Sequence, residues 1–321
     1  MAQQNPSRSE DSVISQLEQE AVHLLSEGRH GEAARLYRQL SKSRPNDDSF
    51  VLALAWAYHD GGQLDEAVAT FETLLERELS RSIFTGFAFD ELVRIYKRQG
   101  NYENLLRICE RAATAQPGDY ALMGDLGDAC LKAGQIDRAV AIFREMVAME
   151  PEDAVAFANL AAALVTLGDM AGADAACTRA AAIEPDKEGL YYSRLASACQ
   201  KGGHIREAED AARKSIKADP AEPARHLALG DLLIAAGRIG EGWQAYEEAC
   251  SMREAAAATY YHRLGNALLQ ALHPEEAVRA FGKAVARDPS NPIYRLKLAE
   301  SCLASGQIDL ARSLLDPFPA T

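Results

Sequence analysis

The sequence predicts an all-α solenoid of about nine helix–turn–helix repeats. One phrase, typified by GQIDRAVAIFREMVAMEP at 134–151, returns along the chain with a small residue at a fixed position, and proline closes six of the copies. The spacing between successive copies is 34, 38, 34, 34, 35, 34, 35 and 34 residues. A period of this size indicates an array in which each helix pair buries its apolar side on its neighbours. The small residue, or its replacement, stands at Ala33, Ala67, Leu105, Ala139, Ala173, Ala208, Gly242, Ala277 and Ala311.

The second helix of each repeat can be read from the copy at 134–151. Gly134 can adopt the positive φ that ends a preceding helix, Asp137 can cap the next helix, and Pro151 stops it. Between these stops, apolar residues recur at helical spacing and form one stripe. That stripe consists of Ala139, Ile142, Phe143 and Met146. Each copy therefore predicts one short amphipathic helix.

The first helix of each repeat lies upstream of this phrase. Twelve residues before the small residue, seven copies carry Ala or Gly, as at Gly230 and Gly265; the weak first copy has Ala21, and Val93 is an exception. Residues 1–12 are polar and lack a periodic apolar face, so we expect a disordered N-terminal lead there, and 317–321 form a tail. The solenoid is assigned to 13–316. Its repeats are expected at about 14–45, 48–79, 86–117, 120–151, 154–185, 189–220, 223–254, 258–289 and 292–316.

Composition argues against several classes of partner. The net charge of −13 disfavours nucleic acid and anionic membrane surfaces, because both require a basic footprint. No apolar run of signal-peptide length opens the chain, and the most apolar stretch, 154–168, is too short to span a bilayer. We therefore expect a soluble cytoplasmic protein without membrane insertion.

Catalytic and metal-binding motifs are missing from the sequence. Five of the six cysteines fall at positions that should pack in the core, and there is no C-x-x-C or Cys/His cluster. The seven histidines are scattered, and no nucleophile-elbow, zincin, P-loop or dinucleotide motif occurs in its structural context. We expect no enzyme activity, no metal and no cofactor.

The chain resembles the tetratricopeptide repeat (TPR) family, whose 34-residue pattern has characteristic residues on both helices. The eighth repeat carries this pattern most completely, with Tyr261, Leu264, Gly265, Ala277, Phe281, Ala284 and Pro289. The resemblance covers about residues 14 to 315. It implies a right-handed superhelix whose first helices (helix A of each repeat) line a concave groove, and a role in holding partner proteins.

The groove residues are those on the side of helix A opposite its packing stripe. This face is polar and mixed in sign, and it also includes Gln200, Arg263 and Gln270. The candidate partner-binding residues are Trp56, His59, Arg94, Lys97, Arg98, Asp128, Lys132, Asn159, Arg194, Lys201, Asp231, His262 and Asn266.

Two features of this face have alternative interpretations. Trp56 either projects into the groove as an interface hot spot or folds onto the neighbouring helix. The basic stripe of Arg94, Lys97 and Arg98 either accepts an acidic ligand or is a solvated face paired with nearby carboxylates. The carboxylate clamp of chaperone-docking arrays is not expected. Asn159 and Arg194 fit two of its slots, but Gly124, Asp128 and Leu190 occupy others.

The array has three irregular places. The connection between the second and third repeats is longer and brings in Ile83, Phe84 and Phe87. Glu254 replaces the proline that closes the seventh repeat, which would let that helix run longer. The last repeat ends early, leaving Leu310, Leu314 and Leu315 short of neighbours unless Phe318 of the tail covers them.

The sequence thus predicts a non-catalytic scaffold that binds an extended segment or helix of another protein in its concave groove. Two alternatives remain. In the first, the chain assembles with itself through its C-terminal end and forms a homo-oligomer. In the second, it is the regulatory subunit of an enzyme complex.

Overall fold

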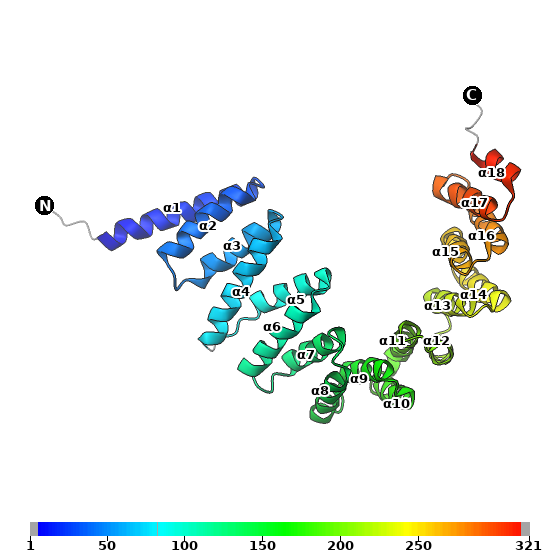
Figure 1. Ribbon diagram of the computed structural model, residues 1–321, viewed down its shortest axis with the longest axis horizontal. Helices are drawn as coiled ribbons and strands as arrows, with labels where there is room; N and C mark the ends of the chain where they lie inside the picture. Colours follow the sequence, from blue (N-terminus) through cyan, green and yellow to red (C-terminus); the bar gives the residue numbers. More distant parts are fainter. Residues whose placement is uncertain (1–5, 82, 316–321) are drawn as a thin grey trace. The chain divides into compact units, whose positions relative to one another are not determined.

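The computed structural model describes residues 6–81 and 83–315, and these form 18 α-helices, two short 3₁₀ helices and no strand (Figure 1). The chain divides into two compact units, Met1–Ile142 and Phe143–Thr321. The helices of the first unit are α1 (Pro6–Ser26), α2 (His30–Ser43), α3 (Asp48–Asp60), α4 (Leu64–Ser80), α5 (Phe87–Gln99), α6 (Tyr102–Ala115) and α7 (Tyr120–Lys132). Helix α8 (Ile136–Met149) crosses the boundary. The second unit contains α9 (Ala154–Leu167), α10 (Met170–Ile183), α11 (Glu188–Lys201), α12 (Ile205–Ala218), α13 (Pro223–Ala235), α14 (Ile239–Met252), α15 (Ala257–Gln270), α16 (Pro274–Arg287), α17 (Pro292–Ala304) and α18 (Ile308–Leu315).

Within each unit the helices pack in chain order. Helices α1 to α7 each contact the next one along the chain, as do helices α9 to α18, and in the second unit α9 also contacts α11 and α13 contacts α15. Odd-numbered helices are therefore the first helices of successive repeats, and even-numbered helices are the second. The all-α solenoid of helix pairs predicted from the sequence is confirmed.

Local sequence signals explain where the helices begin and end. Asp153 accepts hydrogen bonds from the backbone N–H groups of Val155 (2.8 Å) and Ala156 (3.2 Å), which satisfies the first turn of α9. Gly168 ends that helix at φ 90°, a left-handed conformation that suits glycine. Capping by Asp and termination by Gly thus set the helix length in this repeat.

The recurring small residues allow close approach of the two helices in a repeat. A Cβ at Gly230 would lie 2.6 Å from the ring of Tyr246, and a Cβ at Gly265 would lie 2.6 Å from the ring of Phe281. Both rings are fully buried. The second-unit core around them also includes Leu264. Small residues on one helix and a large ring on its partner therefore make up the packing unit of these two repeats.

The six cysteines are all buried and unpaired with one another. Burial raises the pKa of the Cys109 and Cys177 thiols to about 12 in each case. A buried thiol with a raised pKa is a poor nucleophile and a small apolar packing group. The prediction that five of these cysteines belong to the core is confirmed, and the sixth, Cys250, is buried as well.

Two expectations about helix ends are corrected. Helix α1 begins at Pro6, so residues 6–12 are not a disordered lead, while residues 1–5 lie outside the described part of the chain. Proline is favoured at the first helical position because it has no N–H to satisfy there. Arg44 also pairs with Asp11 and ties this extra helical length to the following helix.

The seventh repeat does not continue as a longer helix at Glu254. Helix α14 ends at Met252, Arg253 takes a non-helical conformation (φ −140°, ψ 79°), and a 3₁₀ turn covers Glu254–Ala256. The same kind of turn, Pro185–Lys187, follows α10. A proline is therefore not required at this position, because the 3₁₀ turn forms with Glu254 in its place.

The long connection after α4 is anchored by a buried carboxylate. Glu78 accepts hydrogen bonds from the backbone N–H (3.3 Å) and the hydroxyl of Thr85. Phe84 packs edge-on against Phe89, with ring centroids 5.7 Å apart. Ile83 stays exposed in this connection.

Candidate partner-binding groove

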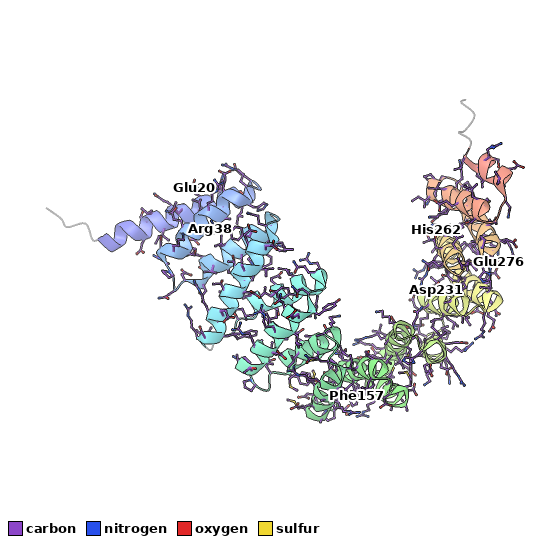
Figure 2. The ribbon with its side chains drawn as sticks, in the orientation of Figure 1. Glu20, Arg38, Phe157, Asp231, His262 and Glu276 are labelled. Atoms are coloured by element: carbon purple, nitrogen blue, oxygen red, sulfur yellow. The ribbon has the colours of Figure 1, made fainter. Side chains whose placement is uncertain are left out.

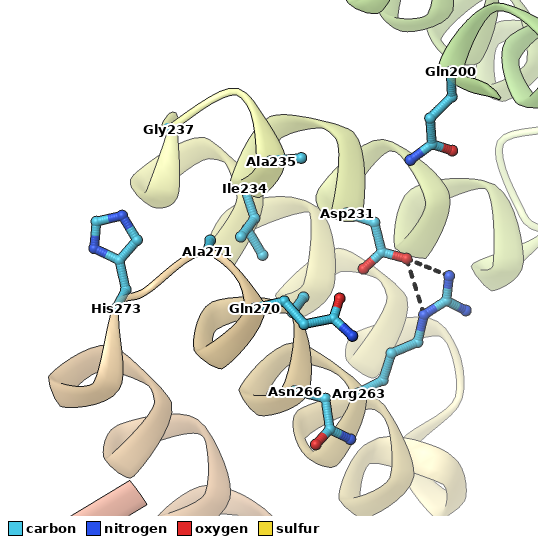
Figure 3. A pocket seen from close by; sticks show the side chains of 11 residues that line it. Gln200, Asp231, Ile234, Ala235, Gly237, Arg263, Asn266, Gln270, Ala271 and His273 are labelled. Atoms are coloured by element: carbon cyan, nitrogen blue, oxygen red, sulfur yellow. Dashed lines mark hydrogen bonds and ion pairs between the residues drawn. The ribbon is translucent and has the colours of Figure 1, made fainter. Parts of the chain in front are cut away.

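A polar pocket of about 560 Å³ lies on the first helices of three successive repeats in the second unit. Asp231 on α13, labelled in Figure 2, is one of its lining residues, and Figure 3 shows the side chains that line the pocket. The polar lining comes from α11, α13, α15 and the turn after α15, and comprises Gln200, Asp231, Arg263, Asn266, Gln270 and His273. The sequence placed all of these residues except His273 on the groove face of the array.

The charged centre of the pocket is a three-residue network. Nε of Arg263 donates to Asp231 Oδ2 at 3.1 Å, and Nη2 donates to the same oxygen (Figure 3). The hydroxyl of Tyr246 donates to Oδ1 of the same carboxylate. Burial, reinforced by the charge of Asp231, raises the pKa of Tyr246 well above its usual range, so the hydroxyl remains a donor. Burial lowers the pKa of Arg263, but the hydrogen bond to Asp231 and the charge of Asp231, together with Tyr246, raise this pKa by more. The two hydrogen bonds from Arg263 to Asp231 fix the guanidinium at the rim of the pocket.

Three side-chain amides surround this ion pair. Gln200 and Gln270 are exposed, Asn266 is half-buried, and each carries both donors and an acceptor. Within the described part of the chain, the side-chain amides of Gln200 and Gln270 form no hydrogen bond with another protein group. The pocket thus offers uncommitted amide groups beside a neutralised charge pair, which suits a polar, uncharged ligand.

His262 lies next to the pocket but faces the following repeat. Its ring packs between Phe281 (5.6 Å between centroids) and Tyr294 (5.1 Å), and its Nδ1 is 3.5 Å from the amide nitrogen of Asn266. Burial, together with the charge of Lys297, lowers the pKa of His262. The structure therefore gives this predicted groove residue a packing role between repeats.

Other predicted residues of the second unit lie outside the pocket. Nη2 of Arg194 on α11 donates to Asn159 Oδ1 on α9 at 3.1 Å, so these two side chains join neighbouring repeats. Lys201 is exposed at the end of α11 and does not line the pocket. Of the candidate partner-binding residues named from the sequence, the pocket brings together Asp231 and Asn266.

In the first unit, the predicted basic stripe is largely neutralised by the protein itself. Nζ of Lys97 lies 2.8 Å from Asp128 and 3.8 Å from Asp125, both on α7. Burial lowers the pKa of Lys97, but these carboxylates together raise it by more. The same carboxylate of Asp128 also lies 3.7 Å from Lys132. Lys97 thus links two repeats.

The remaining two residues of the stripe differ from each other. Arg94 pairs with the buried carboxylate of Glu91 one turn earlier. This is the pairing with nearby carboxylates that was the second interpretation of the stripe. Arg98 is exposed. The stripe therefore presents one unpaired predicted cation, among the described residues, rather than three.

Trp56 is half-buried and folds onto the second helix of its own repeat. Its ring meets the fully buried Phe71 edge-on at 5.6 Å, and His59 meets it at 5.4 Å. Nδ1 of His59 is 2.9 Å from a carboxylate oxygen of Asp60. Of the two interpretations of Trp56, the structure has the one in which it packs on the neighbouring helix.

A cluster on the second helices was not predicted. The ring of Trp243 on α14 lies 5.3 Å from the guanidinium carbon of Arg279 and 5.1 Å from Nζ of Lys283, both on α16. The ammonium of Lys283 also lies 5.0 Å from the ring of Tyr261. Such cation–π contacts add to the packing between repeats. The spacing of Arg279, Lys283 and Arg287 could have indicated this stripe, but the expected groove lies on the first helices.

Within residues 6–81 and 83–315, no group of three or more His, Cys, Asp or Glu side chains is arranged to hold a metal ion. No helix in these same ranges combines the length and apolar character needed to cross a membrane.

Models of one known repeat family match most of the chain. One model of the tetratricopeptide repeat matches residues 24–82, 96–164 and 131–199. Two further models of the same repeat match residues 190–222 and 262–316. A crystal structure of a tetratricopeptide repeat protein from Parabacteroides merdae covers 78% of this chain and 97% of its own, with a TM-score of 0.50 at 16% identity. That likeness concerns the fold alone.

Curated relatives share shorter stretches. Protein FlbA of Caulobacter vibrioides is 30% identical over 137 residues, which is 41% of this chain and 23% of FlbA. The human protein O-mannosyl-transferase TMTC1 is 26% identical over 167 residues, or 51% of this chain and 18% of that protein. The chain therefore spans less than a quarter of either relative.

Proposed function

Because this chain belongs to the tetratricopeptide repeat family, we propose that it is a non-catalytic scaffold that binds an extended segment of another protein in the pocket of α11, α13 and α15. One observation carries the proposal. The pocket lies on three consecutive first helices and combines unoccupied amide groups with an internally neutralised Asp231–Arg263 pair.

The chemistry of the pocket favours a polypeptide backbone as ligand. Its volume of about 560 Å³ is typical of ligand sites, but its lining is more polar than that of sites for apolar small molecules. The amides of Gln200, Asn266 and Gln270 can both donate to a peptide carbonyl and accept from a peptide N–H. The guanidinium of Arg263 has further N–H groups besides the two directed at Asp231. These N–H groups can donate to a carbonyl or to an acidic side chain of the ligand.

The pocket is a poor candidate for catalysis. Its one carboxylate, Asp231, is already held by Tyr246 and Arg263, and no serine, cysteine or lysine lines the pocket as a nucleophile. TMTC1 is named as a transferase, but the match covers 18% of that protein, so its activity is not carried over to this chain. A partner that is itself an enzyme would make the chain a regulatory subunit.

The proposal can be tested by affinity purification from the native cell with matched amide variants. We expect Asn266→Ala combined with Gln270→Ala to lower the recovery of the groove-bound partner about 10-fold or more, since each lost hydrogen bond in a polar site contributes about 1 kcal/mol. The control is Gln244→Ala, which removes an exposed amide from the second helix α14. Equal recovery of every co-purified protein with wild type, the double variant and the control would contradict groove binding.

A further inference from the structure

The last helix pair of the described chain leaves large apolar side chains in solvent. On α17, Leu296 is 48% exposed and Leu303 is 53% exposed, and on α18, Leu315 is 54% exposed. Ile308 and Leu310 are also exposed at the start of α18. Of these five residues, Leu296 and Leu315 occupy the positions whose equivalents in the preceding repeat are covered, and we call the surface that contains them the end face. A patch of this kind on a folded protein usually marks a contact surface.

The preceding repeat shows what covers the same surface inside the array. With Ala277 and Ala311 as equivalent positions, Leu296 corresponds to His262, and Leu315 corresponds to Phe281. Phe281 is fully buried, whereas Leu315 is more than half exposed. His262 is covered by the ring of Tyr294 from the next first helix, 5.1 Å away.

The helix that covers the eighth repeat is α17. Its inner residues recur one turn apart and belong to the same core cluster as Phe281, namely Tyr294, Leu298 and Cys302. The end face of α17 and α18 is therefore equivalent to the side of α15 and α16 on which the apolar helix α17 packs. Its geometry fits helical partners.

The N-terminal helix α1 carries polar residues at two of the positions through which α17 packs on the preceding repeat. In α1, the positions equivalent to Tyr294 and Leu298 are occupied by Gln16 and Glu20, both exposed (Glu20 is labelled in Figure 2). Stacking this end on the end face of another copy would bury the Glu20 carboxylate among leucines, which is costly without a partner charge. Head-to-tail growth of a filament is therefore disfavoured.

Charge permits the end face to meet itself. Helices α17 and α18 carry three basic residues (Arg295, Lys297 and Arg312) and two acidic ones (Glu300 and Asp309) in a chain whose net charge is −13. The local net charge is thus +1, and two copies of this helix pair repel each other little. Opposite signs on both helices also allow complementary contacts around a two-fold axis.

We propose that the chain forms a two-fold dimer in which α17 and α18 of one copy pack through the end face on α17 and α18 of a second copy. The second copy supplies the apolar cover that α17 supplies to the eighth repeat. This interface is separate from the pocket of α11, α13 and α15, so groove binding and dimer formation can succeed or fail independently.

The test is the mass of the full chain in solution as a function of concentration, measured by sedimentation equilibrium or light scattering. We expect wild type to move from 34.8 kDa toward twice that mass as concentration rises. The variant Leu296→Glu with Leu315→Glu should raise the dimer dissociation constant by about 100-fold or more, because buried anchors dominate such interfaces. The matched control is Leu190→Glu on α11, since Leu190 is 49% exposed but lies outside the end face.

Three results decide the outcome. The proposal is supported if wild type and the Leu190 variant form dimers and the end-face variant does not. Circular dichroism must also show that the end-face variant keeps the helicity of wild type. At about 100 µM, even a dimer with a dissociation constant in the micromolar range is populated. A wild-type chain that stays monomeric up to that concentration overturns the proposal. Loss of assembly in Glu20→Lys, or masses that grow beyond a dimer, would show head-to-tail contacts and also overturn the two-fold arrangement.

Discussion

The close packing of α15 on α16 can be tested with two glycines that both occupy ordinary helical backbone. Gly265 in α15 is buried, and an added Cβ would lie 2.6 Å from the terminal carbon of the fully buried Phe281 ring. At Gly282 in α16, an added Cβ would find no atom within 4 Å. Alanine substitution should therefore have opposite effects at the two positions.

The magnitudes follow from two competing effects. In a helix, replacing glycine by alanine stabilises by about 0.5–1 kcal/mol, because alanine loses less backbone entropy on folding. At Gly282 only this effect applies, so Gly282→Ala should stabilise the repeat by that amount. At Gly265 the methyl must displace a buried ring, and overpacking costs about 1–3 kcal/mol. Gly265→Ala should therefore destabilise by up to about 2 kcal/mol.

Native-state hydrogen exchange of α15 and α16 amides is the suitable assay, because repeat arrays need not unfold in one step. Combining Gly265→Ala with Phe281→Leu should cost less than the sum of the two single changes, since the smaller side chain makes room for the methyl. If Gly265→Ala slows amide exchange in α15 to the same extent that Gly282→Ala slows it in α16, Phe281 does not limit the space at Gly265. The packing argument is then wrong.

Three further predictions concern individual side chains. Tyr246→Phe removes the donor to Asp231 and should cost about 1 kcal/mol in unfolding free energy, measured by chemical denaturation, while weakening partner capture. Burial raises the pKa of Cys177 to about 12 and so suppresses its thiolate; thiol reagents at pH 8, followed by mass spectrometry, should modify it slowly in the native chain and rapidly in denaturant. Lys97→Ala should destabilise the first unit by about 1 kcal/mol or less, because the Asp128 carboxylate it neutralises is partly exposed, and the loss should shrink in high salt.

Much of the fold follows from residues that act locally. The glycine at 168 and the aspartate at 153 set helix ends through their own backbone and side chain, so their roles can be read from the sequence. The period of the small residues fixes the pairing of helices for the same reason, since a residue such as Ala277 is completely buried where two helices meet. These signals need no knowledge of distant contacts.

Side-chain partners across repeats could not be read in the same way. Lys97 was assigned to a basic stripe on its own helix, but its nearest carboxylates belong to α7 of the next repeat. His262 was assigned to the groove, but Tyr294 of the next repeat lies over its ring. Both cases depend on the rotation and distance between successive helix pairs, and the sequence of a single helix does not contain that information.

The pocket shows how core packing and the candidate site depend on each other. Because Gly230 has no Cβ, the ring of Tyr246 can pass against α13 at a distance that any other residue would block. The ring is fully buried, yet its hydroxyl reaches the carboxylate of Asp231, the residue next to Gly230, on the pocket side of α13. Asp231 in turn orients Arg263 of the next repeat. A glycine required by helix packing therefore positions a charged group in the groove, which means that packing residues of this repeat contribute to the shape and charge of the site as directly as the polar residues that line it.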